Sequence, residues 1–190
     1  MYKIEKIGPY PITGFIVRGG TSVVYESFHN TLCRKIAIKL VKRNRVTQQQ
    51  IKSEIEINKE IDCDYIMPII DIVEKVPSKY YCAIIMNKAV GTDLLGLILS
   101  QGQLTEHVAV QVANAGLKAL EYLHSNGICH RDIKPDNFFL MDDDINKLDI
   151  VLADFGHATH FSEKEKMKDY TIGTTLYAAP EILNGIPCLF

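Results

Sequence analysis

Apolar and polar residues alternate along the first part of the chain in a way that predicts an antiparallel sheet. Five short runs rich in Ile, Val, Phe and Tyr predict strands, at residues 12–17, 22–28, 35–41, 66–74 and 80–86. The first two runs flank a turn that contains Gly19 and Gly20, so they predict a hairpin. Residues 48–61 combine apolar positions at helical spacing with charges and predict one helix.

The pattern changes after residue 86 and becomes that of a mainly helical region with loops. A short helix is predicted over residues 93–99 and a strand over residues 148–153. Residues 128–140 mix loop and short strand, whereas residues 157–178 carry few large apolar side chains and predict a long surface loop.

A long helix is the clearest feature of this second part. Thr105 is a suitable N-cap, the helix is expected to run to about Asn126, and Gly127 is a fitting terminator. Apolar side chains cover most of its circumference, which is typical of a helix with neighbours on nearly every side. Because most of the following residues predict loop or strand, we expect that this chain lacks some of the material that would bury the helix.

Composition narrows the class of protein. The 190-residue chain is 47% hydrophobic and 23% charged, which excludes a chain that is disordered throughout. Its formal net charge of −2 gives no electrostatic reason to expect a nucleic acid as the main partner. No apolar run approaches the roughly 20 residues that span a bilayer, and the N-terminus has no apolar signal segment, so neither a membrane location nor secretion is expected. Five cysteines, an odd number without a Cys-x-x-Cys pair, predict free thiols in a reducing cytoplasm.

Five short motifs whose side chains could take part in catalysis or binding follow one another along the chain. They are Ala37-Ile38-Lys39 in the third predicted strand, Glu54 in the first predicted helix, His130-Arg131-Asp132-Ile133-Lys134-Pro135-Asp136-Asn137 after the long helix, Asp154-Phe155-Gly156, and Ala179-Pro180-Glu181 at the end of the long loop. Each motif alone is a weak signal, whereas five in this order on these element types are specific. The set resembles the eukaryotic protein-kinase family of the serine/threonine type, over essentially the whole chain.

The resemblance implies an α+β fold with the architecture of a protein kinase. Residues 1–86 would form the N-lobe, a five-stranded antiparallel sheet with one helix. Residues 87–190 would form the hinge and a partial, mainly helical C-lobe with the catalytic loop and activation segment. The later helices of the family's C-lobe are missing from this sequence, so the resemblance implies one kinase domain truncated after Ala179-Pro180-Glu181.

The resemblance also implies the transfer of the γ-phosphate of ATP, with Mg²⁺, to a Ser or Thr hydroxyl of a protein substrate. Asp132 would orient the hydroxyl or accept its proton, and Lys134 would reach the γ-phosphate from the same loop. Asn137 and Asp154 offer the hard oxygen atoms that Mg²⁺ prefers.

Nucleotide binding is implied by residues of both predicted lobes. Lys39 would hold the α- and β-phosphates, and Glu54 would hold Lys39. The family's glycine loop aligns with residues 16–25, where Val17 replaces the first glycine and Ser22 the third. The β-branched side chain of Val17 adds bulk next to the nucleotide, so weaker nucleotide affinity is expected. The implied nucleotide-binding residues are Val17, Gly19, Gly20, Val24, Ala37, Lys39, Met86, Ala89, Phe139 and Asp154.

A second departure from the family lies at Asn58, four residues after Glu54. The family usually has an apolar side chain there, which stacks against the equivalents of Phe155 and Ile69. A polar group should weaken this stack and with it the link between the helix and the Asp154 loop.

Substrate class and control follow from further residues of the resemblance. Lys134 and Gly173-Thr174 match serine/threonine-specific kinases, and Thr174 is expected to support Asp132 and Lys134 by hydrogen bonding. Arg131 favours control by a phosphate in the long loop, because a guanidinium binds phosphate bidentately. The candidate phosphate acceptors are Tyr170, Thr171 and Thr175.

Several residues have simpler explanations. His130 is expected to be a packed structural histidine. His157 and His160 have the spacing of a metal pair, but surface histidines are expected in a loop without other ligands. Residues 142–144, three aspartates, are expected to form a solvated turn.

Two functions are left open by the sequence. The complete catalytic set favours a serine/threonine kinase, whereas Val17, Asn58 and the missing helices predict weak or absent activity of this chain alone. The alternative is a non-catalytic kinase-like module that acts as a binding partner or decoy. An exposed apolar surface on the partial C-lobe would favour aggregation or a partner chain that covers it.

Overall fold

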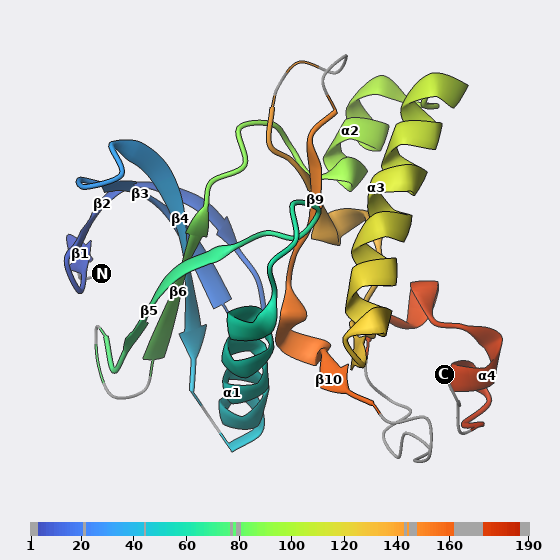
Figure 1. Ribbon diagram of the computed structural model, residues 1–190. Coiled ribbons are helices and arrows are strands. Elements are labelled where there is room, and N and C mark those ends of the chain that lie inside the picture. Colours follow the sequence, from blue (N-terminus) through green and yellow to red (C-terminus); the bar gives the residue numbers. More distant parts are fainter. Residues whose placement is uncertain are drawn as a thin grey trace. The chain divides into compact units, whose positions relative to one another are not determined.

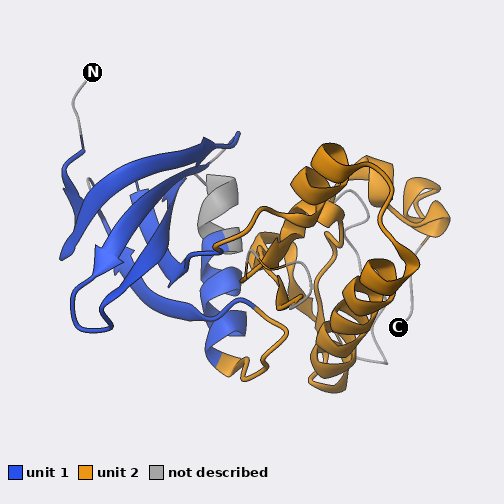
Figure 2. Ribbon diagram, turned by 90° about the horizontal axis from the view of Figure 1, so that it is seen from above, with its two compact units in different colours: residues 1–59, 67–89 blue, residues 60–66, 90–190 orange. Residues whose placement is uncertain are grey.

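The computed structural model describes residues 4–20, 22–43, 45–76, 78, 81–142, 144, 148–161 and 173–186 (Figure 1). The chain forms two compact units, residues 1–59 with 67–89 and residues 60–66 with 90–190 (Figure 2). The boundary predicted at residue 86 lies close to the break at 89. Residues 60–66, expected in the first lobe, belong to the second unit, because the Leu152 N–H donates to the Tyr65 carbonyl at 2.9 Å and Ile66 pairs with Leu152.

The first unit is built on one antiparallel sheet of six strands in the order β1-β2-β3-β4-β6-β5. The strands are β1 (Lys6–Ile7), β2 (Tyr10–Arg18), β3 (Ser22–His29), β4 (Arg34–Lys42), β5 (Ile69–Glu74) and β6 (Tyr81–Asn87). The five predicted strands are present, and β1 is an addition that corrects the expected count. Two residues are too few to show a periodic pattern, and β1 depends on the left-handed turn at Gly8 (φ 57°) that returns the chain to β2.

Alternation in β4 gives the sheet two apolar faces. Ile36, Ile38 and Leu40 are buried in a cluster on one face with Ala83 and Ile85 of β6. The odd-numbered residues of β4 project to the other face, which is covered by helix α1 (Arg45–Glu60). There Val41 is buried with Ile51, Cys82 and Ile84 in a second cluster. The single predicted helix of this unit is thus confirmed, and its apolar side covers the face that also carries Lys39.

Helices dominate the second unit. Helix α2 (Leu94–Gln101) begins after Asp93, whose carboxylate accepts the Gly96 N–H at 2.7 Å. Helix α3 (Glu106–Ser125) begins after Thr105, whose hydroxyl accepts the Val108 N–H. The predicted end of α3 is confirmed as well, since Gly127 adopts φ 66° just after the Asn126 cap.

Short strands and turns connect the rest of the second unit. Strand β7 (Ile128–Cys129) pairs with β10 (Thr159–His160), and β8 (Phe138–Leu140) pairs with β9 (Ile150–Leu152). The prediction of loop throughout residues 157–178 is therefore wrong at β10. The sequence gives little sign of so short a strand, which is held by a hydrogen bond from the Phe161 N–H to the Gly127 carbonyl. Residues 162–172 lie outside the described residues. The final helix described is α4 (Pro180–Leu183).

Helix α3 is buried on one side and carries exposed apolar side chains among polar ones on the other. Ala115, Ala119 and Leu123 are buried, whereas Val110 is 59% and Leu117 66% exposed. Two of the apolar side chains for which the sequence predicts neighbours are thus exposed. No helix of the described part of the chain is long and apolar enough to cross a membrane.

Candidate active site

An ion pair joins the sheet of the first unit to its helix. Lys39 lies in β4 and Glu54 in α1, and Lys39 Nζ is 3.1 Å from Glu54 Oε1. The Lys39 side chain is 16% exposed and that of Glu54 6%, so both charges are largely removed from water. A buried carboxylate next to an ammonium fixes the direction of a flexible lysine side chain. The structure therefore brings together the two residues that the kinase resemblance pairs.

Three further nucleotide-binding candidates share the sheet face of Lys39. Val24 pairs with Lys39 across β3 and β4, and Ala37 pairs with Met86 across β4 and β6. Residues that pair directly across an antiparallel ladder project to the same face, and so do residues two apart on one strand. The face thus presents one ammonium beside a small and two larger apolar side chains.

The turn between β2 and β3 is the glycine loop of the prediction. Its Gly19 N–H donates to the Ser22 carbonyl at 2.9 Å. Neither Gly19 nor Gly20 has a positive φ, and a Cβ at Gly20 would meet nothing within 4 Å. Val17, in place of the family's first glycine, pairs with Val24 and is 52% exposed. The substitution is thus accommodated as an ordinary strand residue.

Ala89 ends the first unit and is partly buried. The neighbouring Lys88 Nζ lies 3.5 Å from the Ala89 carbonyl and 3.5 Å from Glu26 Oε2. Glu26 also contacts Lys35, so it holds two lysines near the end of β6. This arrangement ties the predicted hinge to β3.

A buried carboxylate is the centre of the second unit's site. Asp132 Oδ1 accepts both the backbone N–H of Thr174, at 2.8 Å, and its hydroxyl, at 2.7 Å. Asp132 Oδ2 lies 2.8 Å from Lys134 Nζ and 3.2 Å from Asn137 Nδ2. Lys134 Nζ donates in turn to the Thr174 hydroxyl at 2.8 Å. The support of Asp132 and Lys134 by Thr174, predicted from the sequence, is confirmed.

The surroundings of Asp132 determine its charge. Burial alone would raise the pKa of this carboxyl. Hydrogen bonds from Lys134, Thr174 and Asn137 and the positive charge of Lys134 outweigh burial and hold the pKa below its usual value. Asp132 is therefore ionised at neutral pH, with its oxygens directed by four hydrogen-bond donor groups.

Asn137 and Asp154 lie at the paired ends of β8 and β9. Asn137 ends a 3-10 turn just before β8, and its carbonyl accepts the Ala153 N–H at 2.8 Å, one residue before Asp154. Both N–H contacts of the Asn137 side chain go to Asp132, which directs its Nδ2 there and leaves Oδ1 as the oxygen available for a cation. Asp154 is exposed, and its carboxylate accepts the Gly156 N–H at 3.4 Å.

These residues fit magnesium by the chemistry of their donor atoms. An amide oxygen and a carboxylate are hard ligands, and Mg²⁺ in phosphate sites usually takes one or two protein oxygens with phosphates and water. In the described ranges no three His, Cys, Asp or Glu side chains group as a metal site. Such a complete protein cage is unnecessary for an ion that is shared with a bound triphosphate.

The backbone around this site is unusual in two places. Arg131 has φ 64° and Asp154 φ 65°, both in the left-handed region that non-glycine residues rarely adopt. Backbone conformations of this kind persist where neighbouring contacts impose them and concentrate at functional sites. The Arg131 Nε–H donates to the His157 carbonyl at 2.6 Å, which links the loop before Asp132 to the turn after Asp154.

A buried histidine packs against the loop that carries Asp132. His130 is 1% exposed, its Nε2 lies 3.1 Å from the Ala153 carbonyl, and its Nδ1 accepts the Asp132 N–H at 3.3 Å. Its ring contacts Phe155 edge-on, with centroids 4.9 Å apart. Burial is the main cause that lowers the pKa of His130. The packed structural histidine expected from the sequence is thus present and neutral.

Sequence reasoning missed one residue beside the catalytic loop. His157 was expected to be a surface histidine, but its Nδ1 lies 4.0 Å from Asp132 Oδ2 and its side chain is 35% exposed. His160 fits the expectation better, since it is 53% exposed and contacts Glu60. Nothing in the sequence distinguishes the two histidines, because the left-handed Asp154 and the bond from Arg131 determine where His157 lies.

Other predicted residues are placed as follows. Asn58 Nδ2 donates to the Glu54 carbonyl at 2.8 Å, so its amide is satisfied within α1. Phe139 lies on β8 opposite Val151 and is partly buried in the second unit. Thr175 is exposed in a 3-10 turn. The other two candidate phosphate acceptors, Tyr170 and Thr171, lie outside the described residues.

Comparison with known proteins agrees with these motifs. A family model described as the protein kinase domain matches residues 10–188. A Dictyostelium discoideum protein named probable myosin light chain kinase is 32% identical over 175 residues, which are 90% of this chain and 44% of that protein. Another from this organism, named probable serine/threonine-protein kinase fhkD, is 34% identical over 182 residues, 93% of this chain and 24% of that protein.

A relative from another organism extends the agreement. The serine/threonine-protein kinase H1 homolog of Pinctada fucata is 32% identical over 179 residues, 94% of this chain and 42% of that protein. The chain spans less than half the length of these curated relatives. The match of the family model to nearly all of the chain, together with the ion pair at Lys39 and the buried carboxylate at Asp132, shows that the chain belongs to the protein kinase domain family.

Proposed function

We propose that this protein is a serine/threonine protein kinase that transfers the γ-phosphate of Mg·ATP to a protein hydroxyl. The observation that carries the proposal is the Asp132 carboxylate, ionised, buried and held by Lys134, Thr174 and Asn137. Phosphoryl transfer needs little covalent help from the protein and depends on positioning and on charge stabilisation, which such a fixed set of charges supplies.

Each residue of the second unit has a distinct task in this reaction. Asp132 orients the substrate hydroxyl and takes its proton as the hydroxyl oxygen bonds to the γ-phosphorus and the bond to the departing ADP oxygen breaks. Lys134, already at the Asp132 carboxylate, is placed to neutralise charge on the transferred group. Asn137 and Asp154 would hold magnesium, which supplies positive charge to the phosphates when it is bound.

The first unit is proposed to hold the nucleotide. Lys39, oriented by Glu54, would bind the α- and β-phosphates, and the apolar side chains on the same sheet face would contact the base. A flat heteroaromatic ring suits apolar walls with a few polar groups. Gly19, Gly20 and Val17 would lie over the phosphates, and the backbone at Ala89 would pair with the adenine.

The preference for Ser and Thr over Tyr rests on the link between Lys134 and Thr174. Both residues match serine/threonine-specific kinases, and the lysine donates to the threonine hydroxyl at 2.8 Å. The relatives named as serine/threonine kinases support the same substrate class.

A second candidate is a kinase-like module that binds partners without catalysis. The observation in its favour is Val17, half exposed where the family has the first glycine of its phosphate loop. The two candidates differ in what they require of the second unit, because a binding module needs neither a metal site nor a proton acceptor.

A radiolabelled-ATP assay with a generic protein substrate separates these candidates. Weak Mg²⁺-dependent transfer to Ser and Thr that is lost in Asp154→Ala is the expected result. Asp144→Ala, an exposed aspartate in the same unit, is the matched control and should keep full transfer. Transfer that persists in Asp154→Ala would indicate a contaminating kinase. The absence of Mg²⁺-dependent ATP binding at millimolar nucleotide would favour the binding module instead.

A further inference from the structure

A histidine next to the proposed proton acceptor is the feature that the proposed function does not use. His157 ends the 3-10 turn Phe155–His157, which Asp154 caps. Its carbonyl is fixed by the Arg131 Nε–H at 2.6 Å, so its backbone is tied to the loop that carries Asp132. Its Nδ1 then lies 4.0 Å from Asp132 Oδ2.

The Asp132 carboxylate has little room for another partner. A carboxylate has about four lone-pair positions, and four hydrogen-bond donor groups already contact the two oxygens of Asp132. A substrate hydroxyl must still reach one of these oxygens to give up its proton. His157, 35% exposed, stands beside Oδ2, the oxygen that the backbone of Thr174 does not hold.

The charge of His157 changes what Asp132 can do. A neutral imidazole at 4.0 Å leaves the carboxylate with its present donors. An imidazolium at this distance adds a positive charge, competes for Oδ2 and makes the carboxylate a weaker proton acceptor.

We propose that His157 is a positioning residue for Asp132, whose protonation switches phosphotransfer off as the pH falls. The inference rests on the proposed function and names a form of regulation for the same site. It requires no partner or modification, because the acid-sensitive group and the carboxylate are held together by the turn after Asp154.

Other charged groups bear on His157 from the elements around it. Asp132 presents a negative charge to the imidazole, while the Lys134 ammonium contacts the same carboxylate oxygen, Oδ2. The His130 ring is close enough for the two histidines to repel each other when charged. The Arg131 guanidinium is bonded to the His157 carbonyl, and Asp154 begins the turn. The nearby negative and positive charges therefore act on His157 in opposite directions. The variants below isolate the effect of Asp132.

The pH profile of kcat at saturating Mg·ATP tests the proposal. In the unmodified protein we expect kcat to fall by about tenfold per pH unit on the acid side of a single inflection. His157→Asn, which keeps a nitrogen near the position of Nδ1 but cannot become charged, should remove this inflection. His160→Asn, in the same segment but paired with Glu60, should keep the profile of the unmodified protein.

A purely structural role for His157 predicts a different result. If the side chain only supports the turn, His157→Asn lowers kcat at every pH and leaves the inflection in place, which would overturn the proposal. The inflection is expected to vanish even if the plateau value of kcat also decreases.

A measurement without turnover separates failure of this inference from failure of the proposed function. In NMR spectra of histidine-labelled protein, the His157 resonance is identified by its absence in His157→Asn. Its titration midpoint should move to lower pH in Asp132→Asn, because the carboxylate that favours the imidazolium is gone. An unchanged midpoint would overturn the inference. A shifted midpoint in a protein without phosphotransfer would overturn the proposed function and leave the coupling of His157 to Asp132 established.

Discussion

The two charged centres of the molecule, one in each unit, are placed by different kinds of backbone. Lys39 and Glu54 come from the interior of a strand and a helix with regular hydrogen bonding. Asp132 lies in a loop, and its orientation depends on positive φ angles at Arg131 and Gly173. Regular elements thus fix the first centre through many ordinary contacts, whereas the second depends on a few uncommon backbone angles.

This difference predicts how each centre responds to a substitution. In the first, removal of one side chain removes half of an ion pair but leaves the strand and helix in place. In the second, several donors share one carboxylate, so the loss of the carboxylate is severe, while a change of backbone freedom nearby disturbs all donors together. The predictions below test the two centres in this order of expected effect.

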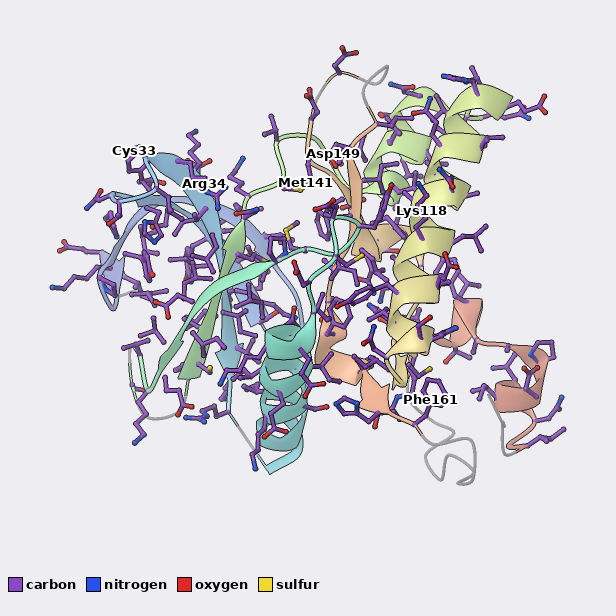
Figure 3. All side chains as sticks on the ribbon, in the orientation of Figure 1. Cys33, Arg34, Lys118, Met141, Asp149 and Phe161 are labelled. Carbon is purple, nitrogen blue, oxygen red and sulfur yellow. The ribbon has the colours of Figure 1, made fainter. Side chains whose placement is uncertain are left out.

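Replacement of the shared carboxylate should have the largest effect. Asp132→Asn keeps the size of the side chain but removes the proton acceptor and presents an NH₂ group to the donors of Lys134 and Asn137. We expect kcat for protein phosphorylation to fall by about 10²- to 10⁴-fold. The exposed Asp149, labelled in Figure 3, provides the control Asp149→Asn, which should keep full activity. A decrease below about tenfold for Asp132→Asn would exclude it as the proton acceptor.

The ion pair of the first unit should give the next largest effect. Lys39→Ala removes the cation next to the buried carboxylate of Glu54, and we expect kcat/KM for ATP to fall by roughly 10²-fold. Glu54→Gln keeps an oxygen that accepts from Lys39 and should cost about tenfold. Lys35→Ala on the same strand, at a side chain that is 66% exposed, is the matched control. Equal kcat/KM for ATP in Lys39→Ala and Lys35→Ala would show that the pair has no part in nucleotide binding.

A glycine substitution tests whether backbone freedom matters more in the second centre. Gly173 has φ 111°, and an added Cβ would lie 2.5 Å from the Arg131 carbonyl oxygen. Gly173→Ala should therefore displace Thr174 from Asp132 and lower kcat by about tenfold or more. Gly102→Ala is the control, because Gly102 has φ 78° but nothing within 4 Å of its Cβ position. It should lower stability by about 1 kcal/mol and leave kcat unchanged. Similar activity in both variants would mean that Thr174 is not held by Gly173.

Periodic patterns in the sequence were long enough to predict most of the fold, with Lys39 in a strand and Glu54 in a helix, whereas the pairing of these two residues was implied by the kinase resemblance. Alternation in residues 35–41 indicated a strand, and the same alternation places Lys39 on the face that α1 covers. The Thr105 cap and the Gly127 terminator marked both ends of α3. The conformation of these segments depends on residues that are close together in the chain. The sequence pattern therefore indicates the secondary structure.

The second centre was predicted by motif and not by pattern. The sequence resemblance identified Asp132, Asn137 and Asp154, but no periodicity predicts a left-handed Arg131 or the approach of His157 to the catalytic loop. The two-residue strands β1 and β10 were missed because they are too short to show a periodic pattern, and β10 also depends on its pairing with β7, which is distant in the sequence. Where tertiary contacts determine the conformation, local propensity does not predict it.

The smallest expected effect is on stability and comes from His130, which packs against the loop that carries Asp132. His130 donates through Nε2 to Ala153 and accepts through Nδ1 from Asp132, so protonation would set an N–H against the Asp132 N–H. Burial lowers the pKa of His130 in the folded state below its unfolded value of about 6.5. A group with a lowered folded pKa contributes its full stability above the unfolded pKa and loses it as the pH falls.

The free energy of unfolding should therefore decrease by up to about 1.4 kcal/mol per pH unit as the pH falls below about 6.5. Asp132, whose pKa is also lowered, loses its contribution only below about pH 4, so between about pH 6.5 and 4 the slope is free of the Asp132 contribution. His130→Leu should be less stable at pH 8 because two hydrogen bonds are lost, yet it should lose this slope. Urea unfolding at several pH values measures both quantities, with the exposed His107→Asn as control. If His130→Leu keeps the slope of the unmodified protein, the acid sensitivity belongs to another group and the neutral tautomer beneath Asp132 is not what stabilises the loop.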